Sequence, residues 1–195
     1  MITENVGMAQ EFTGTRLSTK RIATVMIASF GFYAIYWMYL TWKQLRSERD
    51  VQHFPVWHAL GFLVPEYSLL ITYQHARAIR EVSLGAGLVP RVNPWVAAGL
   101  VASVGVSLGV QILLLAFGVL SGLSELATVL ALDAIDMALM LVLELWMQRD
   151  LNDYWSVVND NGSRHAPVGI GEMVTVLLGL FIWVNSTIKL VGLID

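Results

Sequence analysis

The sequence predicts an all-α integral membrane protein, a bundle of four or five transmembrane helices. The chain has 195 residues, of which 56% are hydrophobic and only 14% are charged, whereas a soluble domain of this size is about 25% charged. The mean hydropathy is +0.62. Several apolar runs approach or exceed the roughly 20 residues that a helix needs to cross hydrocarbon. These runs are too long and too uniform for the alternating strands of a membrane barrel.

We expect a flexible polar tail over residues 1–19, followed by one transmembrane domain over 20–195. The second apolar segment is ambiguous, because Pro65 interrupts it and Glu66 follows at its midpoint; a kinked span and a re-entrant or interfacial hairpin both fit. The polar stretch 74–93 is expected to be a loop with a short helical start. The expected spans are 22–42, 56–73, 95–120, 124–147 and 172–194.

The first expected span is crowded with aromatic residues in its second half, as suits a membrane–water interface. The run GFYAIYWMY, which begins at Gly31, follows the pattern G-x-Y-x-x-Y-W-x-Y. A short basic loop with Lys43, Arg46 and Arg49 comes next, and then an apolar segment that contains Pro55. These features resemble the opening third of an uncharacterised family of bacterial polytopic membrane proteins. The resemblance implies a bacterial inner membrane, and it supplies no activity and no catalytic residues.

Small residues recur every four positions along the expected span 95–120. Such spacing lets another helix approach closely, so we expect a helix-packing face. The letters from Gly105 to Gly109 also match G-x-S-x-G, but a nucleophile elbow needs a strand–turn–helix setting, which an apolar helix does not provide. The residues of the expected packing face are Gly99, Ser103, Gly105, Ser107 and Gly109.

The expected span 124–147 carries four acidic residues, which is the most informative feature of the sequence. At about 100° per residue, Glu125, Asp133, Asp136 and Glu144 fall at roughly 0°, 80°, 20° and 100° around the helix axis. All four therefore share one stripe. A charged side chain at mid-membrane costs roughly 2.5–3.5 kcal/mol on insertion scales. The stripe must therefore face protein, water or a cation rather than lipid.

A buried polar layer is expected to form around this stripe. At about 1.5 Å rise per residue, Gln111, Asp133 and Asn185 each lie a few ångström outward of the midpoints of their spans. Lys189 lies further out and could snorkel or turn inward toward Asp133. Two interpretations stay open: a structural network that fixes helix packing, and a path for protons, cations or a polar solute.

Several kinds of chemistry are not indicated. The chain has no cysteine, and its net charge of −3 is too small to indicate a nucleic-acid partner. The histidines lie at span ends or in loops, and no H-E-x-x-H, P-loop or G-x-G-x-x-G motif is present. The pair Asp133 and Asp136 lacks the neighbouring ligands of a metal centre. We expect no catalytic residues, no metal and no cofactor, and therefore no enzyme.

The leading functional hypothesis is a structural, accessory or complex-forming subunit that works through helix packing, as a homo-oligomer or within a larger membrane complex. The alternative is a small oligomeric channel or transporter that uses the face bearing Asp133 and Asp136. The segments 74–93 and 148–170 contain arginines while the turn 121–124 has no basic residue, so the C-terminus is expected outside. The side of the N-terminus depends on whether four or five spans are present.

Overall fold

The computed structural model describes residues 15–49, 55–119, 122–159 and 166–192. Within these ranges the regular elements are all α-helices. The predicted tail falls mostly on residues 1–14, which lie outside the described residues. The helices are α2 (Thr19–Ala28), α3 (Tyr33–Arg49), α4 (Pro55–Gly61), α5 (Pro65–Gly85), α6 (Pro94–Ala116), α7 (Gly122–Val158) and α8 (Ile170–Gly192).

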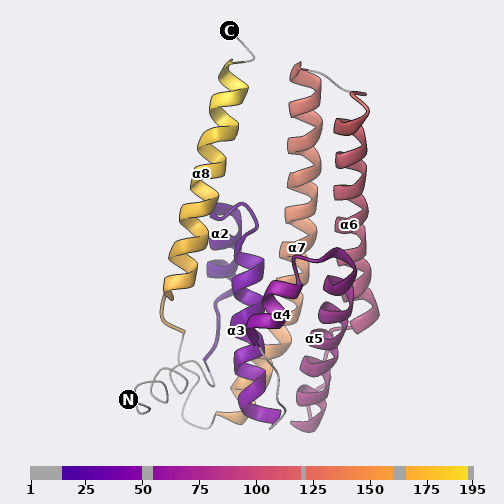
Figure 1. Ribbon diagram of the computed structural model, residues 1–195. Helices are drawn as coiled ribbons and strands as arrows, with labels where there is room; N and C mark the ends of the chain where they lie inside the picture. The colour runs from indigo at the N-terminus through magenta and orange to yellow at the C-terminus, as the bar shows by residue number, and fades with distance from the viewer. Residues whose placement is uncertain (1–14, 50–54, 120–121, 160–165, 193–195) are drawn as a thin grey trace.

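Three helices, α6, α7 and α8, are long and apolar enough to cross a membrane. The all-helical fold is thus confirmed for the described residues, and the three long helices agree with a membrane protein. Figure 1 shows α6, α7 and α8 rising together toward the C-terminal end, while α2 to α5 surround their other half, which we call the base. Helix α7 has 37 residues, which is about 55 Å at 1.5 Å per residue. This length exceeds the roughly 30 Å of hydrocarbon in a membrane. Helix α7 is also longer than α6 and α8, which have 23 residues each, and it extends past them at the base.

The predicted span 22–42 is wrong as a single helix, because the chain turns between α2 and α3. Phe30 and Gly31 have φ angles of +51° and +86°, and this left-handed pair ends the first helix. The Ser29 hydroxyl accepts a hydrogen bond from the Tyr33 backbone N–H at 3.0 Å and so starts the second helix. The turn is invisible to hydropathy because the residues on both sides of it are apolar.

Contacts along α8 show that α2 and α3 form a hairpin whose two ends lie at the base. Arg21 pairs with Glu172 in the first turn of α8. Further on, the Ile27 carbonyl accepts a hydrogen bond at 3.1 Å from Trp183, which lies beyond the middle of α8. The chain then returns, and Tyr33 donates to Glu172 at 3.3 Å. Residues 29–32 are therefore the tip of the hairpin.

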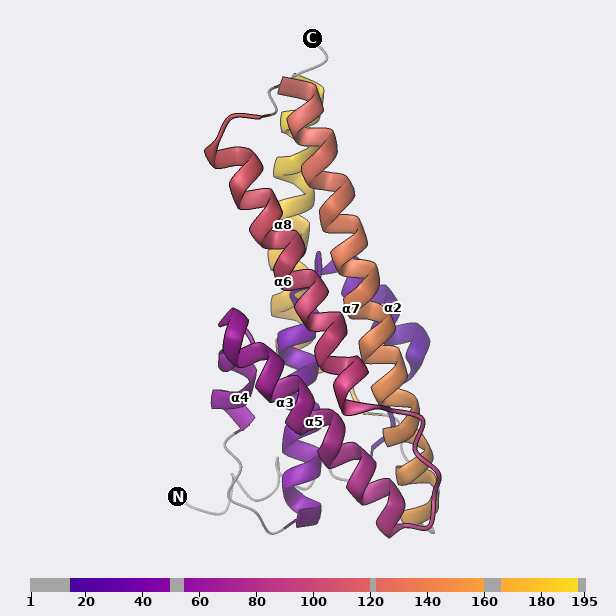
Figure 2. The same ribbon diagram turned by 90° about the vertical axis from the view of Figure 1, so that its right-hand side faces the viewer.

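Helices α4 and α5 form a second hairpin with its tip at residues 62–64. His58 on α4 and His75 on α5 flank the same ring of Trp42, with centroid distances of 4.6 and 4.7 Å. The two arms therefore lie at one level, and the chain reverses between them (Figure 2). Pro65 begins α5, as suits the first turn of a helix. The segment 56–73, for which a kinked span was one alternative, is thus a hairpin.

Two expected loops are largely helical. The basic segment with Lys43 and Arg46 belongs to α3, because Trp42 and Leu45 on the same stretch are fully buried and hold the helix in place. The stretch 74–93 is helical as far as Gly85. Its helix buries one face, which includes Ala76 and Ile79, against its neighbours. Polarity alone predicted loops here because each helix shows only one apolar face.

The extension of α7 organises the base. The Asp150 carboxylate accepts hydrogen bonds from the backbone N–H groups of Arg91 and Val92, both at 2.8 Å. The Asn152 amide donates to the Leu17 carbonyl at 2.9 Å and accepts from the Leu17 N–H at 3.3 Å. One helix therefore fixes both the loop before α6 and the segment that leads into α2.

The tip of the α2/α3 hairpin is seated on a glycine of α8. A Cβ at Gly179 would collide with the backbone of Ser29 and with the Ala28 carbonyl. Close by, the rings of Phe30 and Trp183 make an edge-to-face contact with centroids 5.0 Å apart. Only a residue without a side chain lets the backbones approach this closely, so Gly179 sets how α8 meets the hairpin.

We expect Gly179→Ala to destabilise the protein, because the added methyl pushes the hairpin away; overpacking of this kind costs about 1–3 kcal/mol. The matched control is Gly99→Ala on α6, where a Cβ would meet no atom within 4 Å. That change should be neutral or slightly stabilising, since alanine favours a helix. Thermal unfolding in detergent measures both. Equal loss of Tm in the two variants would contradict the seating of the tip on Gly179.

Candidate functional site: an acidic cavity between the hairpin tips

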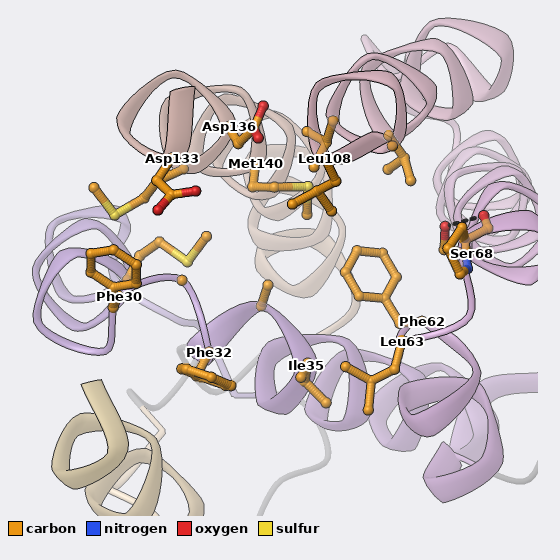
Figure 3. Close-up of a pocket in the computed structure, with 18 of the residues that line it drawn as sticks. Phe30, Phe32, Ile35, Phe62, Leu63, Ser68, Leu108, Asp133, Asp136 and Met140 are labelled. Carbon is orange, nitrogen blue, oxygen red and sulfur yellow. Dashed lines mark hydrogen bonds between the residues drawn. The ribbon is translucent and has the colours of Figure 1, made fainter. Parts of the chain in front are cut away.

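A cavity of about 570 Å³ lies between the two hairpin tips and the facing sides of α6 and α7. Figure 3 shows Phe30 and Phe32 on one side, Phe62 and Leu63 on the next, and Leu108 and Met140 closing the far wall. Most of its lining is apolar. The polar side chains among the described lining residues are Ser68, Asp133 and Asp136.

The cavity lies beside the middle of α6, one of the three helices that are long and apolar enough to cross a membrane. Gly105, on its wall, is the twelfth residue of the 23-residue helix α6. Leu108 and Ile112, further along the same helix, line it as well. If α6 crosses a membrane, the hairpin tips and the cavity are therefore inside the hydrocarbon layer. The two tips complete the walls that α6 and α7 leave open.

The two aspartates take different orientations in this cavity. The Asp133 carboxylate points into the space between Phe30 and Met140, whereas Asp136 turns toward α6 (Figure 3). Asp136 is 7% exposed, and its Oδ2 accepts a hydrogen bond from Gln111 Nε2 at 3.4 Å. Its Oδ1 is buried and has no hydrogen-bond partner among the described residues. Asp136 is thus part of the α6–α7 contact, and Asp133 is the carboxylate that a bound molecule would meet.

The structure forms only part of the expected polar layer. Gln111 and Asp136 do meet, but Asn185 and Lys189 lie on the exposed surface of α8. The Asn185 amide donates to the Phe181 carbonyl of its own helix at 2.7 Å. Helix α8 packs on α2 and α3 near the base, and its outer half stands apart from α7 (Figure 1). Position along the predicted spans placed Gln111, Asp133 and Asn185 at a similar depth, but it could not show which helices are neighbours.

The small-residue face of α6 makes no close helix contact within the described chain. A Cβ at Gly99, Gly105 or Gly109 would meet no atom within 4 Å. Gly105 and Gly109 instead line the cavity, and Ser103 donates to the Gly99 carbonyl at 3.0 Å. A contact between this face and a second chain stays a prediction. Close contacts at glycines fall instead on α8, at Gly171 and Gly179, and on α4, at Gly61. None of these three was among the residues predicted to pack.

The remaining acids of the stripe lie at its two ends. Glu125 is half-buried near the outer end of α7. Glu144 is 1% exposed, two turns past Asp136 toward the base, and neither of its carboxyl oxygens has a hydrogen-bond partner among the described residues. The described side chains contain no group of three or more His, Asp or Glu that could hold a metal ion. The site is thus a cavity into which the Asp133 carboxylate points, beside the Gln111 side chain, and Glu144 is a second buried acid below it.

Sequence reasoning missed the cavity walls that the hairpins provide. Phe30, Phe62 and Ser68 come from segments expected to be spans or a kinked helix, so their convergence on α7 was not predictable from spacing. The signals that could have located the tips are Gly31, with its positive φ, and Pro65, which begins a helix. Both are residues that mark turns as readily as they occur within membrane helices.

Comparisons of the chain with protein-family models, with curated proteins and with solved structures gave no match. The resemblance of the first third to an uncharacterised bacterial family therefore stays a prediction.

We expect Gln111→Leu to destabilise the protein because it leaves the buried Asp136 carboxyl without its partner, a loss of about 1–3 kcal/mol. Asn185→Leu is the matched control, since that side chain is exposed and bonds only to its own helix. It should leave the stability unchanged or slightly raised in detergent. Thermal unfolding measures the difference, and a greater loss for Asn185→Leu would instead favour a polar layer that includes α8.

Proposed function

We propose that the protein binds a hydrophobic cation within the membrane, with its apolar body in the cavity and its charge beside Asp133. The observation that carries this proposal is a carboxylate that points into an apolar cavity at mid-span. Among the described lining residues there is no Lys, Arg or His to neutralise it. A carboxylate in such surroundings is costly unless a positive charge pairs with it. A channel or transporter for such molecules is the class of protein that fits best.

The chemistry of the walls argues for an organic cation rather than a metal ion. A dehydrated hard cation such as Ca²⁺ takes six to eight oxygen ligands, whereas this cavity offers few oxygens. The Ser68 hydroxyl is already engaged with the Pro65 carbonyl at 2.6 Å. The volume of about 570 Å³ lies in the range of roughly 300–1,000 Å³ that is usual for small-molecule sites. An ammonium group on an apolar body matches both the charge and the walls.

The proposal includes a placement in the membrane. In place of four or five spans, we propose three spanning helices and two re-entrant hairpins that enter from the base. The basic residues then gather at the base. Arg21 pairs there with Glu172 of α8. Lys43 of α3, Arg80 of α5 and Arg149 of α7 lie on the parts of these helices that are nearer the base than the hairpin tips are. Lys189 alone among the basic residues described lies at the far end. By the positive-inside rule the base is cytoplasmic and the C-terminus is outside, in a bacterial inner membrane if the family resemblance holds.

A complex-forming subunit stays the second candidate function. Its support is the exposed part of α6, where Gly99 and Ser103 present a small-residue face with no neighbour in the described chain. Such a face suits a helix of another chain. A partner that copurifies at fixed stoichiometry would favour this function. The two candidates are compatible, because Gly99 and Ser103 are not among the residues that line the cavity.

Binding of a matched pair of molecules tests the cation proposal. Isothermal titration calorimetry on the protein in lipid nanodiscs compares hexyltrimethylammonium with its uncharged carbon isostere. The wild type should bind the cation about tenfold or more tightly than the isostere, since tenfold corresponds to about 1.4 kcal/mol. Asp133→Asn keeps the shape but removes the charge, and it should abolish that preference. Equal affinity of the wild type for the two molecules would overturn the proposal.

A second pair of variants tests the location of the site. Gly105→Leu places a bulky side chain in the cavity, where a Cβ meets nothing within 4 Å, and should weaken cation binding about tenfold or more. Gly99→Leu puts the same side chain on the same helix outside the cavity and should bind like the wild type. Both variants should unfold at similar temperatures. If Gly99→Leu weakens binding as much as Gly105→Leu, the cation binds elsewhere.

A further inference from the structure

The cavity is open on one side, between the tip of the α4/α5 hairpin and α6. The exposed residues of its described lining all come from these two elements, and we call the opening that they surround the mouth. Leu63 is 60% exposed, Leu108 46% and Ile112 65%. The other described lining residues are buried or half-buried. The residues of the mouth are Leu63, Pro65, Gly105, Leu108 and Ile112.

The mouth begins where α5 stops covering α6. Val101, Gly105, Leu108 and Ile112 all line the cavity, and at about 100° per residue they fall at roughly 0°, 40°, 340° and 20° around α6. They therefore share one narrow stripe. Val101 is only 5% exposed, because α5 packs on this part of α6. Helix α5 begins at Pro65, in the hairpin tip, and α6 continues past that tip without cover (Figure 2).

The mouth offers nothing that water could bind through side chains. Its residues are apolar or glycine, whereas Ser68, Asp133 and Asp136, the polar side chains of the described lining, are not exposed. An ordered water needs two to four polar partners, and the mouth provides none from its side chains. If α6 crosses a membrane, the mouth extends from the middle of this helix toward its outer end and therefore opens onto hydrocarbon.

The Asp133 carboxylate lies across the cavity from the mouth. In Figure 3 it is on the side of Phe30, whereas Phe62 and Leu63 are on the opposite side. A molecule that comes through the mouth therefore passes apolar walls before it reaches the carboxylate. A positive charge does not stay in hydrocarbon without a partner, while an apolar chain does. This asymmetry sets the orientation of an elongated ligand, with the charge innermost.

We propose that the cation enters the cavity sideways from the lipid, through the mouth. This inference rests on the proposed cation site. The ligand class is then an amphipathic cation that dissolves in the bilayer, for example a single alkyl chain with a trimethylammonium head. Its head reaches Asp133, and its chain runs back past Leu63 and Ile112 into the hydrocarbon. The mouth lies toward the outer end of α6, so the ligand comes from the leaflet that is further from the base.

The reaction of a single cysteine inside the cavity tests the side of entry. The chain has no native cysteine, and Met140 is buried on the far wall, so Met140→Cys places one thiol inside. In proteoliposomes N-hexylmaleimide, which dissolves in lipid, should modify this thiol about tenfold or more faster than a sulfonated maleimide that stays in water. Mass spectrometry measures both rates, each relative to the rate for the same protein unfolded in sodium dodecyl sulfate.

Bulky side chains at the mouth locate the entry. Ile112→Trp and Leu63→Trp, each combined with Met140→Cys, should slow the reaction with N-hexylmaleimide about tenfold or more. Leu113→Trp is the matched control, because Leu113 is the next residue of α6, is 55% exposed and does not line the cavity. It should leave the rate unchanged. Thermal unfolding shows which variants fold, and if one variant of the mouth does not fold, the other decides.

Several outcomes would overturn entry from the lipid. These are no reaction with N-hexylmaleimide, equal relative rates for the two reagents, and equal slowing by Leu113→Trp and the variants of the mouth. Protection by hexyltrimethylammonium keeps this inference separate from the proposed function. The cation should protect the thiol, and Asp133→Asn should remove the protection but not the reaction. If the cation gives no protection while the mouth behaves as expected, the cation site fails and the opening to lipid stands.

Discussion

A row of polar side chains on one face of α7 cannot face lipid, and the rest of the structure is arranged to cover it. Asp136, Glu144 and Gln148 follow this face from mid-span to the base, and each is at least nine-tenths buried. A charge at mid-membrane costs roughly 2.5–3.5 kcal/mol on insertion scales. Helix α6 covers one side of the row through Gln111, and the hairpins α2/α3 and α4/α5 cover the remainder. The cavity is the place where neighbouring side chains do not fill the space beside this face of α7.

The sequence allowed the helical class, the three long helices and the inner face of α7 to be predicted, because each depends on local properties. Length and apolar content identify α6 and α8, and helical periodicity places Asp133, Asp136 and Glu144 on one stripe. Hydrogen-bonding capacity made Gln111 a partner for an aspartate of the next helix, since the two helices are joined by a short turn. Sequence patterns therefore predicted contacts between helices that follow each other directly in the chain.

The α2/α3 hairpin, the cavity and the position of α8 could not be predicted, because they depend on contacts between distant parts of the chain, whereas a hairpin at 56–73 was one of two alternatives that the sequence left open. The turn at Phe30 and Gly31 lies within one apolar run, so hydropathy reads two short helices as one span. Gly179 matters only because Ser29 happens to lie against it. If the two hairpins are re-entrant, as we propose, neither counts as a crossing, and the side of the N-terminus no longer depends on a choice between four and five spans.

The most direct test of the account is whether both ends of the α2/α3 hairpin lie on one side of the membrane. Lys20 and Arg46 are exposed at those ends, and the chain has no native cysteine. Single cysteines at the two positions can therefore be labelled in intact cells with an impermeant maleimide. The account predicts that the two positions behave alike, both protected until the membrane is permeabilised. Labelling of one position and protection of the other would show that residues 22–42 cross the membrane, and would contradict the hairpin on which the cavity depends.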